Sequence, residues 1–409
     1  MLRRLASRVL SRLFPPLPPL TLSVESELGV CRLVEDLGAG TTADLPPEGL
    51  IVEQSQSRHV PEEEMRERLA GRTGGVDLPY WHDGTGGALV GGVHISRVST
   101  VLHAPEFGAV IRPDGVVLRS SIAEALYLTP TLAALPYVTV TDGKAQLSPP
   151  HGLKTLGPSA VFMPWGGRFN YGHFVLDGLS ALAAIEQAGL LRGRQPIAPP
   201  LTPWARQALD LFFGAEGPRV VECAEPLVWL EEAVVATPMD HFLHAPGPVM
   251  RVVRERMLAN LDEPSTGLSH IYVSRRGDTK RHMRNEAALE AALEAQGFTV
   301  VQPEGLPVAR QIALFRDAEV IVAPTGAALA NTLFCRPGAI VVELQPTNYT
   351  GIWTRAVCHQ AGAHWHGYFV VSPLKETELY LEGEVRPGTF FEWEAPIDDF
   401  LGFLANIGK

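Results

Sequence analysis

Apolar and polar positions alternate most regularly in the last third of the chain. Apolar runs that predict strands lie at 270–274, 298–301, 320–323 and 340–344. Between these runs the pattern predicts helices over 286–296, 307–316 and 326–334. Asn285 stands where it could cap the first helix, and Gly297 where it could end it. Strands and helices that alternate in this way predict a parallel sheet with helices on both faces.

The same alternation begins near residue 160. A strand is predicted over 160–163, a glycine-rich loop over 165–172, and a helix from His173 to Ala188. A further helix and two strands are predicted at 204–213, 219–223 and 234–236. Residues 20–150 have a less regular pattern, which predicts mixed strands and loops.

A chain of 409 residues has room for two or three domains. We expect an α/β protein with two Rossmann-like domains facing a cleft, the N-terminal one over 21–245 and the C-terminal one over 246–409. A linker is predicted at 241–248, where two prolines and a glycine interrupt the pattern.

Residues 1–20 form a basic amphipathic segment ahead of the first domain. Apolar residues recur at near-helical spacing up to residue 14, arginines lie between them, and prolines follow. This pattern is typical of an interfacial membrane anchor. A basic tail, or a helix docked on the protein itself, would have the same pattern. We expect a cytoplasmic protein, with peripheral contact of residues 1–14 at the inner face of the membrane as the open alternative.

The composition limits which classes of ligand and cofactor the protein is expected to bind. The net charge is −11, so nucleic acid is a poor candidate, and any anionic ligand needs cations concentrated around it. The four cysteines are far apart, which fits a reducing compartment and predicts no disulfide framework. The chain has no D-x-D carboxylate pair and no G-x-x-x-x-G-K-[ST] phosphate loop. His241, His244, His364 and His366 have no companion ligands at metal spacing, so we expect no metal site and no cofactor.

Cations follow the predicted strand at 270–274. Ser274, Arg275, Arg276 and Arg281 belong to the most cationic stretch of an acidic chain. Ligands of open α/β sheets bind at the carboxyl ends of strands, and guanidinium groups match phosphate oxygens. The stretch therefore predicts a phosphate site, although a solvated loop with scattered salt bridges would have the same composition.

Two later strand ends carry further candidates. Thr325, Gly326 and Ala327 form a small-residue turn that leads into the helix containing Asn331, and a helix start attracts phosphate. Such a turn also serves close packing. Glu343 lies near the end of an apolar strand and could accept ribose hydroxyls, cap a helix or pair with an arginine.

The N-terminal half offers a candidate for proton transfer. Asn170 and Gly172 end the glycine-rich loop, and His173 and Asp177 follow at helical i,i+4 spacing. Either side chain could take a proton from an acceptor hydroxyl group, while a structural pair that stabilises the helix start is the alternative.

These motifs, taken together and in this order, resemble glycosyltransferase family 61, whose bacterial members include capsular polysaccharide biosynthesis proteins. The motifs are N-Y-G-H-F-x-x-D at 170–177, S-R-R at 274–276, R-N-E at 284–286 and G-A-x-L-x-N at 326–331. They cover less than half of the chain. One position departs from the family pattern, since Thr325 stands where a histidine usually precedes the Gly-Ala pair.

The resemblance implies a GT-B fold and an inverting, metal-independent transfer of a sugar from a nucleotide-sugar to a glycan or glycolipid acceptor. It implies that Asp177 is a candidate base and that the Ser-Arg-Arg loop and the Gly-Ala helix start hold the nucleotide diphosphate. Thr325 keeps open the alternative of a catalytically degenerate, nucleotide-binding scaffold in a polysaccharide-synthesis complex. A sugar-nucleotide epimerase of the same architecture is the third alternative.

Overall fold

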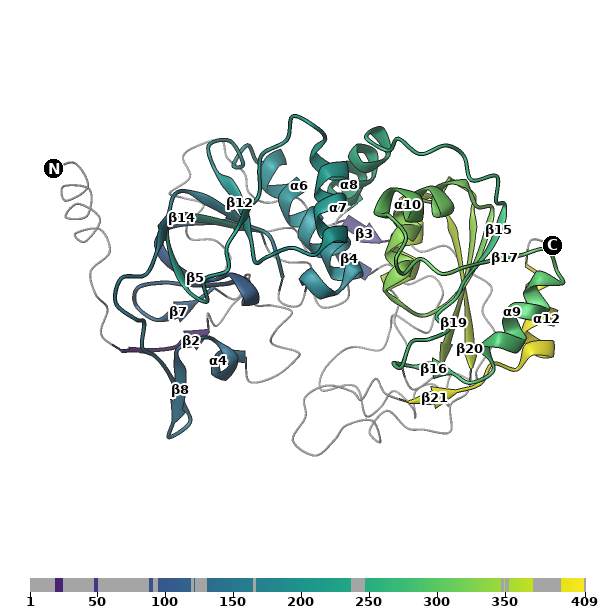
Figure 1. Ribbon diagram of the computed structural model, residues 1–409, viewed down its shortest axis with the longest axis horizontal. Helices are drawn as coiled ribbons and strands as arrows, with labels where there is room; N and C mark the ends of the chain where they lie inside the picture. Colours follow the sequence, from purple (N-terminus) through teal and green to yellow (C-terminus); the bar gives the residue numbers. More distant parts are fainter. Residues whose placement is uncertain are drawn as a thin grey trace. The chain divides into compact units, whose positions relative to one another are not determined.

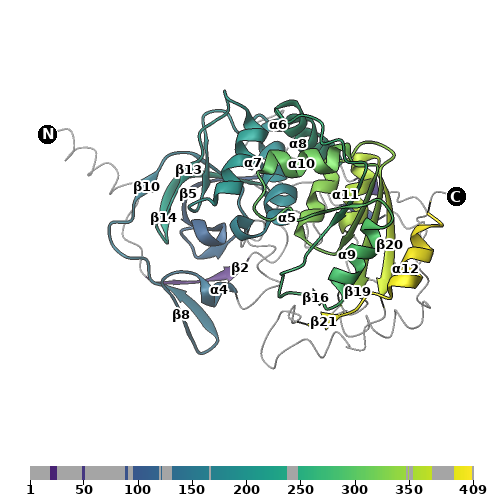
Figure 2. The same cartoon turned by 45° about the vertical axis from the view of Figure 1, so that its right-hand side comes forward.

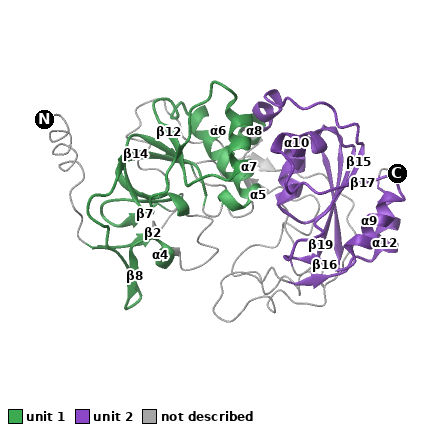
Figure 3. Cartoon of the chain, viewed as in Figure 1, with its two compact units in different colours: residues 1–47, 91–253 green, residues 48–90, 254–409 purple. Residues whose placement is uncertain are grey.

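The computed structural model describes residues 19–24, 48–50, 88–90, 95–118, 121, 131–164, 167–236, 247–346, 349, 353–370 and 391–407. The chain divides into two compact units, residues 1–47 with 91–253 and residues 48–90 with 254–409 (Figure 3). The predicted N-terminal segment 1–14 and the linker residues 241–246 lie outside the described residues.

The second unit is built on a parallel sheet. Its five described strands are β15 (His270–Val273), β17 (Thr299–Val301), β18 (Val320–Pro324), β19 (Ile340–Pro346) and β20 (His364–Val370). They lie side by side in the order β17-β15-β18-β19-β20, and every neighbouring pair is parallel. The strands predicted from the apolar runs are therefore confirmed, and the sheet is of the Rossmann-like kind.

Helices cover both faces of this sheet, as predicted. They are α9 (Glu286–Glu294), α10 (Val308–Asp317), the 3-10 helix η7 (Ala327–Phe334), α11 (Trp353–Ala361) and α12 (Ile397–Leu404). α9 and α12 lie on one face, while α10 and α11 lie on the other (Figures 1 and 2).

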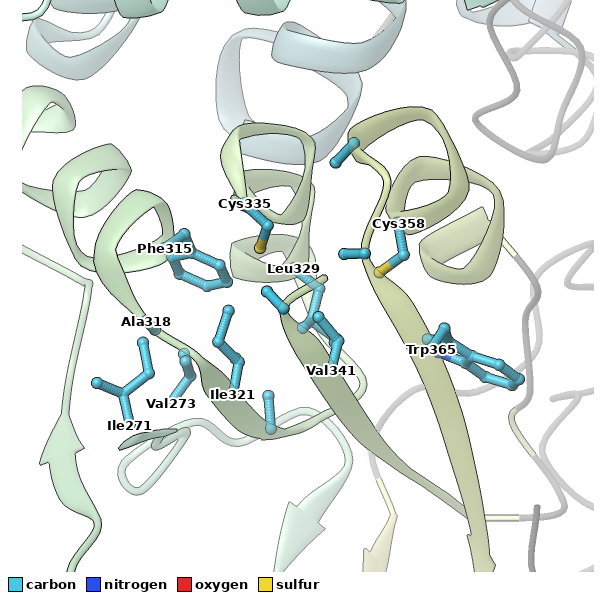
Figure 4. Packing of buried hydrophobic residues seen from close by; sticks show 14 of the residues in the cluster. Ile271, Val273, Phe315, Ala318, Ile321, Leu329, Cys335, Val341, Cys358 and Trp365 are labelled. Carbon is cyan, nitrogen blue, oxygen red and sulfur yellow. The ribbon is translucent and has the colours of Figure 1, made fainter. Parts of the chain in front are cut away.

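Side chains that alternate along each strand pack into two separate cores. Ile321 points toward the α10 side and contributes to the cluster that contains Phe315, Leu329 and Cys358 (Figure 4). Its neighbour Val322 belongs to the opposite cluster, with Leu289 and Leu293 of α9 and Phe400 of α12. A strand covered on both faces needs apolar residues at every position, which is why these strands read as unbroken apolar runs.

Asn285 occupies the N-cap position of α9, as predicted, but its side chain does not cap the helix. The backbone of Asn285 is at φ −102° and ψ 22°, and its side chain makes no cap hydrogen bond. Its amide instead forms two hydrogen bonds with the backbone of Ala395, donating to the carbonyl at 2.7 Å and accepting from the N–H at 3.0 Å. Asn285 therefore ties the start of α9 to the segment that follows the small parallel pair β16 (His282–Met283) and β21 (Glu392–Trp393).

The first unit contains a mixed sheet. Its nine described strands are β13 (Val221–Glu222), β12 (Gln195–Ala198), β11 (Ser159–Val161), β14 (Val228–Ala236), β5 (Ile95–Ala104), β6 (Ala109–Ile111), β7 (Val116–Val117) and β2 (Ser23–Val24), with β10 (Thr155–Leu156) also beside β14. β13, β12, β11 and β14 run parallel, whereas β14 and β5 run antiparallel.

Shorter strand pairs and helices complete the described residues. The other strands are β1 (Leu20–Thr21), β9 (Lys144–Leu147) and β8 (Val138–Thr141), which form a three-stranded sheet, and β3 (Glu48–Leu50) paired with β4 (Ala88–Val90). The helices of the first unit include α4 (Thr131–Ala134), α6 (Leu179–Gln187) and α7 (Pro203–Phe213), and α8 (Gly247–Ala259) continues into the second. None of the helices among the described residues is long and apolar enough to cross a membrane.

Each sheet has a point at which the chain changes direction across the sheet. In the second unit the chain leaves β15 for β17 on one side and later returns to β18 on the other. In the first unit it leaves β11 for β12 and β13, and returns to β14 on the other side of β11. At such a switch point the loops that follow the two adjacent strands, β15 and β18 or β11 and β14, lead away in opposite directions. Ligands of open α/β sheets bind in the space between these loops.

Candidate functional site

The loop after β15 reaches across the switch point of the second unit. The Arg275 guanidinium donates from Nη1 to the Thr325 carbonyl oxygen, in the loop after β18. Its Nε and Nη2 also donate to Asp278 Oδ2, at 3.0 and 2.7 Å, and Nη2 donates to the Lys280 carbonyl at 3.2 Å. Arg275 thereby joins the carboxyl ends of β15 and β18, the two strands that flank the switch point.

Gly326 favours this close approach of the Arg275 side chain. A Cβ atom added at Gly326 would lie 3.1 Å from both Cδ and Nη1 of Arg275. The backbone of Gly326 is extended, at φ −179°, so conformational freedom is not the reason for the glycine. The missing side chain leaves the space that the guanidinium fills.

The helix η7 begins directly after this contact. The first N–H groups of a helix have no partner inside it, and they attract negative charge. Ala327 is the first residue of η7 and is exposed, whereas Asn331 is fully buried further along the helix. The predicted Gly326, Ala327 and Arg275 are thus brought together, while Asn331 lies in the core.

Two carboxylates of α9 hold the loop after β15 from behind. Glu286 Oε1 accepts hydrogen bonds from the Arg275 backbone N–H at 2.7 Å and from the Tyr272 hydroxyl at 2.9 Å. Glu290 Oε1 accepts from the Ser274 hydroxyl at 2.6 Å. Burial raises the pKa of Glu286, and the two hydrogen bonds to its charged form oppose that rise.

The two arginines of the predicted site diverge. Arg275 extends toward β18, but Arg276 pairs with Glu290 Oε2 of α9 at 3.4 Å. Its side chain is half-exposed and lines an open cavity of about 440 Å³ beside α9 and β17, together with Glu294 and Gln302. Ser274 is fully buried, and its hydroxyl is engaged with Glu290 and the Arg276 N–H.

Arg281 lies on the far side of the same loop. Its guanidinium stacks over the Tyr349 ring, 4.5 Å from the centroid, and its carbonyl accepts a hydrogen bond from the Trp393 indole at 2.8 Å. Burial lowers the pKa of Arg281, and the charge of Arg275 acts in the same direction. Because the charge of Arg275 lowers the pKa of Arg281, the two guanidinium groups are close enough to interact electrostatically.

Glu343 is fully buried beneath the β18 loop. Its Oε2 accepts a hydrogen bond from the Trp365 indole at 2.8 Å. Burial raises the pKa of Glu343, and the hydrogen bond from Trp365 opposes the rise. Thr325, which stands in the place of the usual histidine, is itself buried directly after β18. A role of Glu343 with ribose stays a prediction.

The predicted proton-transfer residues follow β11, at the switch point of the first unit. The chain passes from β11 through the 3-10 helix η5 (Gly167–Phe169) to α5 (Tyr171–His173) and the π-helix η6 (Phe174–Gly178). Asn170 caps this helix, because its side chain accepts from the N–H groups of Gly172 and His173 at 3.0 and 3.4 Å. π-helical turns are rare and occur frequently at functional sites.

His173 and Asp177 form a dyad. His173 Nδ1 lies 2.8 Å from Asp177 Oδ2, as the i,i+4 spacing predicts. The Asp177 side chain is fully buried, whereas 27% of the His173 side chain is exposed. Of the two side chains, only the imidazole therefore has surface exposed to solvent, while the carboxylate is enclosed by the protein.

The pattern of the sequence did not reveal several residues that build the site. Tyr272, Glu286, Glu290 and Tyr349 position its arginines, although none was predicted to do so. The i,i+4 spacing of Glu286 and Glu290, directly after a cationic loop, is the signal that could have identified the two carboxylates. Among the described residues, no cluster of three or more histidine, cysteine, aspartate or glutamate side chains is arranged to hold a metal ion.

Comparison with known families agrees with the resemblance of the motifs. The sequence model of the family Glycosyltransferase 61 matches residues 171–342, a range that runs from the helix of the His173–Asp177 dyad to β19. These residues form a Glycosyltransferase 61 domain, and such a domain implies a glycosyltransferase enzyme. Its substrates are in general a sugar donor and an acceptor. No curated protein matches the sequence.

The contact between Gly326 and Arg275 leads to a stability prediction. Gly326→Ala should lower the free energy of unfolding by about 1 kcal/mol, because the added methyl group forces the guanidinium to shift. Urea unfolding measures the change. Gly402→Ala is the control, since nothing lies within 4 Å of a Cβ atom at that helical position. Equal or greater stability in Gly326→Ala than in the wild type would contradict the packing described here.

Proposed function

We propose that the protein is an inverting glycosyltransferase that moves a sugar from a nucleotide-sugar to a glycan or glycolipid acceptor in the synthesis of a surface polysaccharide. One observation carries the proposal. The family motifs lie at the carboxyl ends of β11 and of β15 with β18, which are the switch points of the two sheets. Such points are where α/β folds bind ligands.

The second unit supplies the groups for the nucleotide diphosphate. Arg275 binds one oxygen of Asp278 through two nitrogens, and the same fork fits a phosphate oxygen. The exposed start of η7 adds N–H groups and the positive end of a helix dipole. A diphosphate would exchange with Asp278 at the Arg275 guanidinium, next to Gly326 and Ala327.

The first unit supplies the proton acceptor. In the transfer, the acceptor hydroxyl oxygen forms a bond to the anomeric carbon, and the bond from that carbon to the diphosphate breaks. The nucleoside diphosphate leaves with the electron pair, and the hydroxyl proton passes to His173 Nε2. Asp177 accepts from the protonated Nδ1, so it fixes the ring and stabilises the positive charge that develops on it.

A nucleotide-binding scaffold without turnover is the second candidate, and Thr325 is the observation that favours it. A threonine hydroxyl carries no charge with which to stabilise the leaving diphosphate. Release of UDP, GDP or CMP from the corresponding nucleotide-sugars by purified protein separates the candidates. Turnover that depends on His173 excludes the scaffold, and binding without turnover excludes the enzyme.

Substitutions in the dyad should reduce turnover. His173→Ala is expected to lower kcat by about 10²–10⁴-fold with little effect on nucleotide affinity, because proton transfer is lost while the diphosphate site is unchanged. Asp177→Asn should also lower kcat, since the ring loses its charged partner. Steady-state kinetics with the responsive nucleotide-sugar measures both, and exposed His151→Ala is the control. Unchanged turnover in His173→Ala would show that another group takes the proton.

Substitution of Arg275 should weaken nucleotide binding. Arg275→Ala is expected to raise the Kd of the nucleoside diphosphate about tenfold or more, because a charged hydrogen bond to phosphate is lost. Arg275→Lys should restore little of the affinity, since an ammonium group lacks the fork. Isothermal titration calorimetry measures the Kd, and thermal unfolding checks that each variant is folded.

Arg336→Ala is the matched control for Arg275. Arg336 pairs with Glu319 at 2.9 Å, near the start of β18 and at the amino ends of the strands. Arg336→Ala should change the Kd of the nucleoside diphosphate by no more than about twofold from the wild-type value. Equal affinities of the Arg275→Ala and Arg336→Ala variants would place the diphosphate elsewhere.

A further inference from the structure

Phe169 exposes its aromatic ring to solvent directly ahead of the dyad helix. The residue is 68% exposed, more than the other two large apolar side chains exposed among the described residues, Tyr137 and Val140. It is the last residue of η5 and precedes Asn170, the cap of the helix that carries His173. Single exposed apolar residues are common on protein surfaces. Phe169 differs because it lies next to the dyad helix and because its ring is held in place.

The ring is held in place by its neighbour Arg168. The Arg168 guanidinium carbon lies 4.3 Å from the centroid of the Phe169 ring, which is a cation–π contact. Arg168 Nε lies 3.1 Å from Glu106 Oε1, and Nη1 donates to the Pro200 carbonyl at 3.3 Å. Because the guanidinium takes one face and most of the side chain is exposed, the other face of the ring is open.

The backbone beneath the ring is fixed as well. The Gly167 N–H donates to the Pro164 carbonyl at 2.9 Å, and the Asn170 N–H donates to the Gly167 carbonyl at 3.2 Å. A Cβ atom at Gly167 would lie 3.0 Å from the Met163 sulfur, so the turn packs closely on the end of the strand segment. A rigid aromatic side chain binds at low entropic cost, because little conformational freedom is left to lose.

We propose that Phe169 is the platform on which a pyranose ring of the acceptor stacks, so that an acceptor hydroxyl is presented to His173. A sugar ring has one face of C–H groups, which carry partial positive charge, and the face of an aromatic ring is negative. Arg168 adds a guanidinium group beside the platform, which can donate hydrogen bonds to sugar hydroxyls. This inference rests on the proposed function, and it names a residue that selects the acceptor.

Glycan binding without donor tests the platform independently of turnover. Saturation-transfer NMR and titration with a panel of methyl and p-nitrophenyl hexosides, pentosides and N-acetylhexosaminides should identify a glycoside that the wild type binds. Phe169→Ala and Phe169→Leu should each raise its Kd about tenfold, because both remove the aromatic face. Phe169→Trp should keep the Kd within about twofold, since a larger aromatic face remains.

Val140→Ala is the control, because it shortens an exposed apolar side chain in β8 of the same unit. The platform is overturned if the wild type binds none of the glycosides, or if Phe169→Ala and Val140→Ala bind equally well. Glycoside binding that depends on Phe169, in a protein that transfers no sugar, would reject the proposed function and keep the platform. Transfer with an unchanged acceptor KM in Phe169→Ala would reject the platform and keep the function.

Discussion

The contact of Arg275 with the backbone at Thr325 and Gly326 is the interaction on which the proposed nucleotide site depends. It joins two loops that the topology of the sheet drives apart, since β15 and β18 are neighbours whose following segments leave in different directions. The missing side chain of Gly326 leaves room for this contact. Glu286 fixes the Arg275 backbone from the other side through a buried carboxylate. A single guanidinium is thus held at the position where α/β sheets bind ligands.

The electrostatics of this site differ from a simple cluster of cations. The protein carries a net charge of −11, and two arginines near the site have acidic partners: Arg275 pairs with Asp278, and Arg276 with Glu290. Paired in this way, the arginines are compatible with an acidic protein. An incoming diphosphate would compete with a carboxylate for Arg275. Discrimination in favour of phosphate would then come from its additional contacts with the start of η7.

Much of the fold could be predicted from the sequence, because strands covered on both faces appear as uninterrupted apolar runs. β15, β18 and β19 lie within one or two residues of their predicted bounds. Asn285 shows the limit of such reasoning. Its side chain could cap the helix or form hydrogen bonds with a backbone segment far away in the sequence. Only the fold brings the backbone of Ala395 within reach. The ten-residue strand β5 escaped prediction, because its antiparallel neighbour β14 is more than a hundred residues away in the chain.

The candidate site was predictable in its parts but not in its geometry. The i,i+4 spacing of His173 and Asp177 predicts their contact, yet not which of them a substrate can reach. Burial of Asp177 makes that distinction, since of the two side chains only that of His173 has exposed surface. Arg275 and Arg276 are neighbours in the sequence, and only the strand end beneath them determines that they point to different sides of β15.

Hydrogen–deuterium exchange with and without nucleoside diphosphate tests the central claim most directly. Amide exchange reports local opening of the backbone, and a ligand that contacts a loop slows it. The account predicts that the nucleotide protects residues 274–281 and 325–329, the two loops that Arg275 joins. Protection confined to other segments, with exchange in these two loops unchanged, would contradict it.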